Sequence, residues 1–290
     1  MKTRLLLSIA VLMTVVITAQ ARTYLIYFDN EAVRVTDENK DNLTTLLTDA
    51  GLLTAGTVTL STNGEVLKLT LNGAKLQALN GGYNTTLAIG EDLTLELIGE
   101  NEIVYDLDKT YGDALWCGSD KKVTLTGSGT LTCKAPASSM HDGVNIREGA
   151  TLLIDGNATL IAIGRSTGVY GDENGKLIIN YGTLKASCAD QWGRNQIEVL
   201  SGIQLGEGVT ITQPAGAYFS DGGISIVNAD GSVIPRDTEI IITGGKASGI
   251  ASTTASAQNS GRRYNLQGQR VGKEYRGIVV ENGRKRVRKM

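Results

Sequence analysis

The chain has 290 residues, of which 36 are glycine and only 3 are proline, a composition that suits short strands joined by tight turns and argues against a proline-rich linker chain. Residues 22–261 hold 16 basic against 28 acidic side chains, a balance of −12, whereas residues 262–290 hold 10 against 2, a balance of +8. An acidic body argues against nucleic-acid binding, which needs a basic footprint.

The first 21 residues have the pattern of a secretory signal peptide. Lys2 and Arg4 precede the apolar run Leu5–Ile17, and Ala19-Gln20-Ala21 supplies a small-residue cleavage site. The run is too short to span a bilayer comfortably, and no later segment is a better candidate, so we expect no transmembrane segment. The mature protein is expected to begin near Arg22 and to be secreted.

Residues 22–60 are predicted to form an N-terminal cap and the first strands. Arg22–Val35 is typical of a hairpin that turns at Asp29-Asn30. Thr36 is predicted as the N-cap of one helix, stopped by Gly51, with an apolar face made by Leu43, Leu46, Leu47 and Ala50. Such a cap would cover the open strand edge at the end of a solenoid.

Residues 61–245 contain an internal repeat, clearest between His141–Gly164 and Thr167–Ser187. Each copy has a Gly-Val opening, a polar turn, an alternating apolar run and a closing Thr-Leu run. Alternation with period two indicates half-buried strands, and copies this small must stack to bury their apolar faces. The sequence therefore predicts an all-β fold, a single-stranded right-handed parallel β-helix (solenoid).

The register of the coils follows from three columns of apolar residues, which predict interior ladders. The opening column is Leu87, Leu115, Val144 and Val169, and the closing column is Leu131, Leu160, Leu184 and Ile211. The middle column is Leu93/Leu95, Val123/Leu125, Leu152/Ile154, Leu177/Ile179 and Ile203/Leu205.

By this register the cysteines Cys117, Cys133 and Cys188 face inward as small hydrophobic residues and form no disulfide framework. Cys133 shares its column with Ala162 and Ala186. The only histidine, His141, is expected to be a solvated turn residue.

The C-terminal part divides into three predicted pieces. Gly222–Gly245 carries two or three strands that close the far end of the solenoid. Residues 246–261 are rich in Ser, Ala, Thr and Gly and predict a flexible linker. In the tail, residues 262–290, the Asn282-Gly283 turn predicts a hairpin of Ile278–Val280 with Arg286–Arg288.

Two resemblances follow from these motifs. Asp142-Gly143-Val144, Leu152–Ile154 and Gly182-Thr183-Leu184 resemble the repeats of a secreted bacterial carbohydrate-binding β-helix family, over about Val66–Thr212. This resemblance implies a β-helix that binds carbohydrate. The next coil opens with Thr167-Gly168-Val169 and lacks the acidic residue, which argues against a regular calcium ladder.

The tail is similar to the C-terminal sorting domain of proteins exported by the type IX secretion system. The matching residues are Tyr264-Asn265-Leu266, Gly268-Gln269, Val271 and Gly277–Val280. This resemblance implies the secretion machinery as a partner and the outer cell surface as the location. The alternative is a small appended hairpin with no export role.

The predicted register also places candidate binding residues on the outside. Ala88, Trp116, Asn145 and Tyr170 share one outward column, where the two rings would lie roughly 10 Å apart, two coil steps of about 4.8 Å. Such a platform suits the apolar faces of a polysaccharide, and Tyr111 and Trp192 in flanking turns would widen it. The alternatives are that a loop covers the rings or that they are scattered hydrophobic residues of the surface.

Other chemistry has weaker signals. Parallel β-helices include polysaccharide lyases, but no catalytic motif surrounds the outward acids, so we expect no enzymatic activity. Asp142, Asp172 and Glu173 offer the oxygen ligands that calcium prefers, although acidic residues are also common in turns.

The sequence thus predicts a secreted, surface-displayed, non-catalytic protein whose partner is a polysaccharide, with calcium as a possible cofactor. A purely structural adhesion scaffold is the alternative, and a polysaccharide lyase is a second one.

Overall fold

The computed structural model describes residues 21–63, 66–79, 85–109, 111–136, 140–189, 195–220 and 223–245, and three strands within residues 263–288. Residues 1–20 of the predicted signal peptide and the whole predicted linker, residues 246–261, lie outside the described residues. The chain divides into two compact units, Met1–Ser248 and Gly249–Met290.

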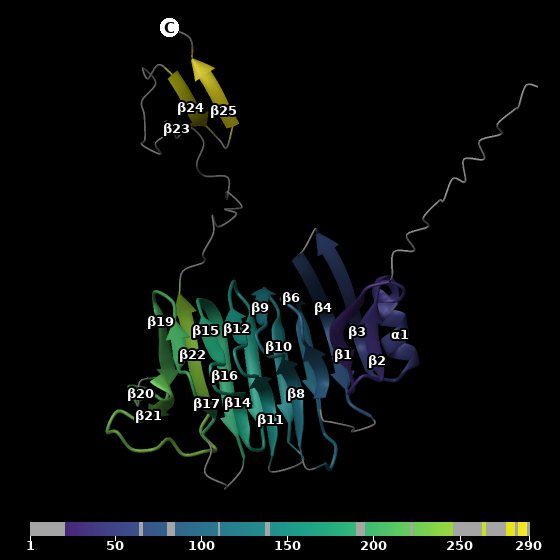
Figure 1. Cartoon of the computed structure of the whole chain (residues 1–290). Coiled ribbons are helices and arrows are strands. Elements are labelled where there is room, and N and C mark those ends of the chain that lie inside the picture. The colour runs from purple at the N-terminus through teal and green to yellow at the C-terminus, as the bar shows by residue number, and fades with distance from the viewer. Residues whose placement is uncertain are drawn as a thin grey trace, which may run out of the picture. The chain divides into compact units, whose positions relative to one another are not determined.

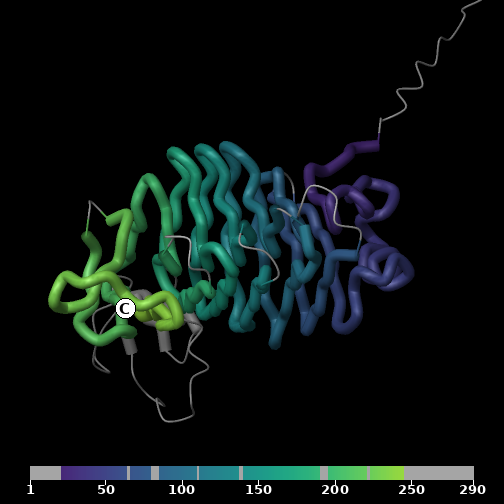
Figure 2. Tube along the Cα trace, turned by 90° about the horizontal axis from the view of Figure 1, so that it is seen from below, coloured from purple at the N-terminus to yellow at the C-terminus, as the bar shows by residue number. Residues whose placement is uncertain are grey.

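The first unit is a parallel β-helix, as predicted, and its coils stack side by side along one axis (Figures 1 and 2). Within the described residues, four coils each contribute three strands. The first coil has β5 (Thr85–Ile89), β6 (Leu93–Ile98) and β7 (Glu100–Val104), and the second has β8 (Gly112–Cys117), β9 (Lys122–Gly127) and β10 (Thr130–Ala135). The third coil has β11 (His141–Ile146), β12 (Thr151–Ile154) and β13 (Thr159–Gly164), and the fourth has β14 (Thr167–Gly171), β15 (Lys176–Ile179) and β16 (Tyr181–Cys188).

The first strands of the coils, from β5 to β14, belong to a seven-stranded sheet, and the second and third strands belong to a 13-stranded sheet. The long strand β4 (Val66–Gln77) joins the two halves of the larger sheet, because Leu67–Asn72 pair with β6 and Lys75–Gln77 pair with β7. Each coil therefore has two of its three sides in one continuous sheet.

The predicted interior ladders are confirmed except at Ile211, the last residue of the closing column. Leu115 lies opposite both Leu87 and Val144, and all of these side chains are fully buried. Burying such an apolar side chain contributes about 1.5–3 kcal/mol relative to leaving it exposed. The paired residues of the other two ladders are Leu95–Leu125–Ile154–Ile179–Leu205 and Leu131–Leu160–Leu184.

The closing ladder includes a polar residue, Asn101. Asn101 lies opposite Leu131 and is 2% exposed. Its Oδ1 accepts the backbone N–H of Ala74 at 2.9 Å, and its Nδ2 lies 3.1–3.2 Å from the carbonyls of Ile98, Gly99 and Thr130. Both ends of this amide have partners, which is what makes its burial tolerable.

The N-terminal cap has the predicted hairpin, with β1 (Thr23–Phe28) antiparallel to β2 (Val33–Thr36). The helix α1 spans Leu43–Asp49 and buries Leu43 and Leu47. The predicted N-cap at Thr36 is wrong, because Thr36 is the last residue of β2 and Asn42 is the N-cap of α1. The backbone N–H of Thr36 donates to the Asn39 side-chain oxygen.

The helix covers the edge of β3 (Leu53–Asn63), which pairs with β4. The Thr44 hydroxyl of α1 donates to the Val58 carbonyl at 2.8 Å and accepts the Val58 N–H at 3.0 Å. These bonds occupy backbone groups of an otherwise open strand edge.

The far end of the solenoid is closed by an inserted antiparallel strand. After β17 (Ile197–Val199), β18 (Ile203–Leu205) and β19 (Val209–Gln213), the strand β22 (Ile240–Gly245) enters between β16 and β19. Ile211 therefore does not stack on Leu184 as predicted, because Ile242 of β22 lies between them. A short hairpin of β20 (Tyr218–Ser220) and β21 (Ser225–Val227) completes this end.

All three cysteines are buried and unbonded to one another, and Cys133 pairs with Ala162 in the ladder, as predicted. Burial raises the pKa of the Cys117 thiol to about 12. The prediction for His141 is wrong. His141 is fully buried at the start of β11, its ring meets Tyr105 edge-on at 5.1 Å, and its Nε2 lies 2.9 Å from the Lys109 carbonyl.

The second unit contains β23 (Arg263–Tyr264), β24 (Gly277–Glu281) and β25 (Arg284–Arg288). The antiparallel pairing of β24 with β25 confirms the predicted hairpin.

Candidate functional site

The outward column predicted on the seven-stranded sheet is present in the structure. Trp116 lies opposite Ala88 on one side and Asn145 on the other, and Asn145 lies opposite Tyr170. Their strand neighbours Leu115, Val144 and Val169 are fully buried in the core, so pleating turns this column outward. We call Trp116, Asn145 and Tyr170 the aromatic row.

The aromatic row continues beyond the predicted residues. Tyr27 of β1 lies opposite Ala88, with the Arg34 guanidinium 5.1 Å from the centre of its ring, and Glu198 of β17 lies opposite Tyr170. The outer face of this sheet thus carries aromatic or polar side chains across several consecutive strands.

The ring of Trp116 is positioned by glycine. A Cβ added to Gly118 would stand 3.0 Å from the Trp116 ring and 2.8 Å from the Gly90 Cα, so the indole packs beside a residue that has no room for a side chain. Trp116 and Tyr170 are both partly buried and retain some exposure. A ring that packs on backbone in this way keeps its orientation, which favours stacking with a ligand.

Asn145 is the recessed residue of the row. Its side chain is shorter than the two rings that flank it, and it is only 8% exposed. Its amide group donates a hydrogen bond to the Asp113 carboxylate, whereas its Oδ1 is shielded from solvent and has no hydrogen-bond partner among the described residues. A buried acceptor without a donor is costly and marks a position that requires an explanation.

Asp113 and Asp142 lie directly opposite each other on neighbouring strands, and we call them the acidic pair. The Asp113 carboxylate accepts the backbone N–H of Asp142 as well as the Asn145 amide. Burial first, and then the charge of Asp142, raise the pKa of Asp113 well above its usual range. Asp142 is 5% exposed.

The pairing of Asp113 with Asp142 was not predicted from the sequence, although a signal was present. It stands two residues before Leu115, as Asp142 stands two residues before Val144, and these two apolar residues share the opening ladder. The register alone therefore places the two carboxylates opposite each other.

The residues predicted as calcium ligands are not brought together. Asp142 lies opposite Thr167, five residues before Asp172, so roughly 16 Å of strand separates them. Asp172 pairs instead with Arg147 at 3.2 Å, and Glu173 is exposed. Over the described parts of the chain, no group of three or more His, Cys, Asp or Glu side chains could hold a metal ion.

The two flanking aromatics have different outcomes. Tyr111, just before β8, is 52% exposed. Trp192 lies outside the described residues.

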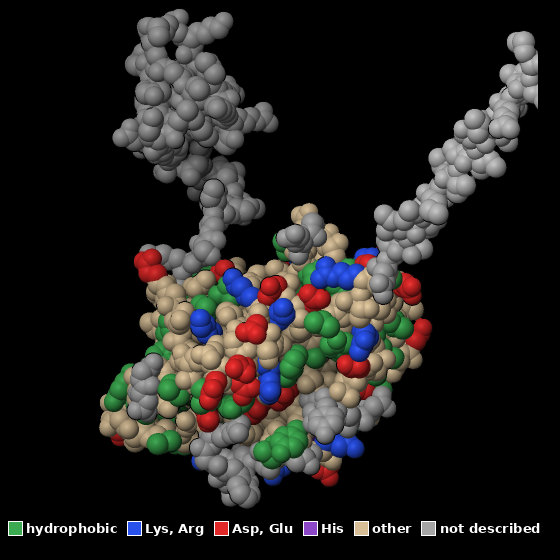
Figure 3. Space-filling model, in the orientation of Figure 1, with side chains coloured by type: hydrophobic (Ala, Val, Ile, Leu, Met, Phe, Trp, Pro, Cys, Tyr) green, Lys and Arg blue, Asp and Glu red, His purple; other side chains and the backbone are tan. Residues whose placement is uncertain are grey.

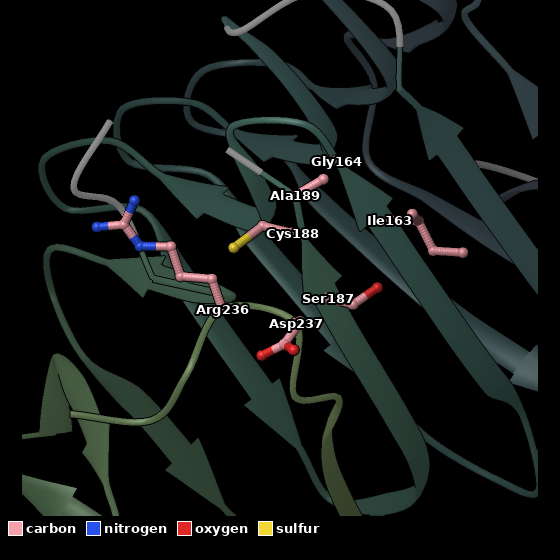
Figure 4. A pocket seen from close by; sticks show the side chains of 7 residues that line it. All are labelled: Ile163, Gly164, Ser187, Cys188, Ala189, Arg236 and Asp237. Carbon is pink, nitrogen blue, oxygen red and sulfur yellow. The ribbon is translucent and has the colours of Figure 1, made fainter. Parts of the chain in front are cut away.

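A separate pocket lies near the far end of the solenoid (Figure 4). It is bordered by Ile163 and Ser187 of two adjacent strands and by Arg236 and Asp237 of the loop before β22. The buried Gln196 holds that loop, because its Nε2 donates to the carbonyls of Pro235 and Thr238 at 2.7 and 2.9 Å. None of the described residues that line this pocket is aromatic.

On the face seen in Figure 3, acidic and basic side chains are interspersed and form no continuous basic patch. None of the helices in the described ranges has the length and apolarity needed to cross a membrane.

Comparisons with protein families, with curated proteins and with solved structures find no match for this chain. The fold places it among parallel β-helix proteins, and its family membership and export route stay predictions from the motifs.

Proposed function

We propose that this protein is a secreted, surface-displayed, non-catalytic β-helix that binds a polysaccharide on its seven-stranded sheet. The observation that carries the proposal is the aromatic row, in which Trp116 and Tyr170 flank a recessed Asn145 whose Oδ1 has no partner among the described residues.

The geometry suits a long polymer better than a small molecule. Trp116 and Tyr170 are two coil steps apart, roughly 10 Å, so a chain running along the axis of the solenoid would place successive sugars over the two rings. The apolar face of a pyranose packs on an aromatic ring, and its hydroxyls supply donors for the Asn145 oxygen. The coils beneath are held by interior ladders that do not involve these side chains.

The acidic pair raises the question of hydrolysis or lyase chemistry. Glycosidases place a substrate between two carboxylates that are roughly 5–10 Å apart. Here the two residues are immediate register partners, Asp142 is almost fully buried, and the Asp113 carboxylate is occupied by an N–H and an amide. This arrangement favours a binding role over a catalytic one.

The partial burial of Trp116 and Tyr170 is what favours the second candidate, an adhesion scaffold in which the rings merely pack on the sheet. A glycan array with the mature protein, run with and without calcium, separates the two candidates. The scaffold predicts no glycan-specific signal in either condition.

Titration of the array's best glycan then tests the row itself. Trp116→Ala should weaken binding by about 1–3 kcal/mol, by analogy with the stacking of bases on aromatic rings, with little change in Tm. The matched control is Tyr218→Ala, which removes a 48% exposed ring on the hairpin at the far end. Equal affinity of Trp116→Ala and the wild-type protein would contradict the proposal.

Surface display rests on the signal-peptide pattern and the sorting-like tail. Deleting residues 262–290 removes strands of the second unit only, so the β-helix should fold unchanged. In the native host the truncated protein should accumulate in the periplasm, and normal surface amounts of it would contradict the export route.

A further inference from the structure

The polar atoms beside the aromatic row can accept hydrogen bonds but have almost none to donate. The Asn145 amide is already bonded to Asp113, and the remaining Oδ1 is an acceptor without a partner on a side chain only 8% exposed. An ionised carboxylate accepts hydrogen bonds and has none to donate. A ligand that completes this site must therefore bring donors.

The charge of the site points in the same direction. Asp113 and Asp142 are register partners, and Glu198 extends the row beyond Tyr170. The nearby Arg147 is engaged by Asp172 at 3.2 Å. Burial and the charge of the facing Asp142 raise the pKa of Asp113, which agrees with two carboxyl groups held side by side. An anionic sugar such as a uronate would add a further negative charge here, whereas a cationic ligand would relieve the repulsion.

The two rings select among cationic ligands. An ammonium group near Trp116 or Tyr170 gains cation–π attraction, and a sugar ring that carries it gains stacking. A bare calcium ion takes six to eight oxygen ligands, whereas the register brings three side-chain oxygen sources together here, from Asp113, Asp142 and Asn145.

We propose, building on the glycan-binding function above, that the ligand of the aromatic row is a polysaccharide of amino sugars with free, protonated primary amines. The amine is placed against the acidic pair and Asn145, and the sugar faces lie on Trp116 and Tyr170. Since Asn145 Oδ1 is shielded from solvent, the side chains around it move when the amine enters, and the emission of Trp116 changes.

Isothermal titration of the mature protein tests this assignment with four probes of equal length. These are the β-1,4-linked hexamers of glucosamine and of N-acetylglucosamine, the α-1,4-linked hexamer of galacturonic acid, which is tested with and without calcium, and hexalysine. The glucosamine hexamer is expected to bind at least tenfold more tightly than the other three. Acetylation removes the charge and leaves the ring faces unchanged, so this pair of sugars isolates the role of the amine.

Two variants locate the preference. Asp113→Asn should reduce the ratio between the glucosamine and N-acetylglucosamine hexamers to near one, and it is expected to fold because it removes a half-buried charge that faces Asp142. Asp142→Asn is the second variant if the first does not fold. Glu96→Gln, which removes a carboxylate from an ion pair with Lys68 on the other sheet, should leave the ratio unchanged.

Equal affinity for the acetylated and free-amine hexamers would overturn this inference and leave glycan binding intact. Tighter binding of the galacturonate hexamer in calcium would overturn it in favour of a metal-bridged acidic glycan. Hexalysine binding as tightly as the glucosamine hexamer would overturn the sugar assignment. Binding of no glycan at all, there or on the array, would instead remove the proposed function on which the inference rests.

Discussion

Two buried asparagines, one inside the solenoid and one on its outer face, show how the same side chain serves different purposes. Asn101 is 2% exposed and both ends of its amide are bonded, to Ala74 and to three carbonyls. Asn145 is 8% exposed, and its Oδ1 has no partner among the described residues. A satisfied buried amide stabilises the fold, whereas an unsatisfied one costs stability and is better explained by a ligand.

The largest expected effect lies on the interior side of this comparison. Leu160 is fully buried between Leu131 and Leu184, so Leu160→Asp would bury a carboxylate without a partner and cost more than about 4 kcal/mol. We expect the loss of cooperative thermal unfolding, measured by circular dichroism. The matched control is Ile161→Asp, its partly exposed neighbour on the same strand, which should remain folded. An unchanged Tm for Leu160→Asp would refute the register.

The register of the ladders is the part of the fold that the sequence predicts best. The pleat of a strand turns alternate side chains to opposite faces, so an alternating apolar pattern shows directly which residues face the core. Leu131, Leu160 and Leu184 follow from their spacing alone. Ile211 does not, because the strand that displaces it arrives about 30 residues later and antiparallel. No local pattern encodes such a long-range insertion.

The errors in the cap and at His141 have similar causes. Thr36 has a side chain suited to an N-cap, but its backbone is part of β2, where it pairs with Thr23 of β1. His141 is buried because Tyr105, which follows β7 two coils earlier, packs against it. On the outer face, the aromatic row followed from the register, and Asp113 could have been found by applying the same register to polar residues.

The next largest effect tests the satisfied asparagine. Asn101→Ala should lower the free energy of unfolding by about 2–4 kcal/mol, since it leaves several buried backbone groups without partners. Chemical denaturation measures this loss. Asn72→Ala, at an exposed position of β4, should change stability by less than about 0.5 kcal/mol. Equal effects of the two variants would show that the hydrogen bonds of Asn101 contribute nothing.

A smaller effect of opposite sign is expected at the acidic pair. The folded state raises the pKa of Asp113 above the ordinary value of 3.8, so the group destabilises the fold above the raised pKa, and this cost disappears as pH falls toward 3.8. Asp113→Asn should therefore raise Tm by a few degrees at pH 7, with a difference from wild type that shrinks toward pH 4. A Tm gain that stays constant with pH, or a loss at pH 7, would contradict the repulsion between Asp113 and Asp142.

The most direct test measures both stability and affinity for Asn101→Ala and Asn145→Ala. Thermal unfolding gives the Tm of each variant, and titration with the glucosamine hexamer gives its affinity. The account predicts that Asn101→Ala loses stability while its remaining folded fraction keeps the wild-type affinity. Asn145→Ala should keep or gain Tm and lose at least tenfold in affinity. An Asn145→Ala protein that binds as tightly as wild type but unfolds at a lower temperature would make Asn145 a second structural asparagine and contradict the binding role of the aromatic row.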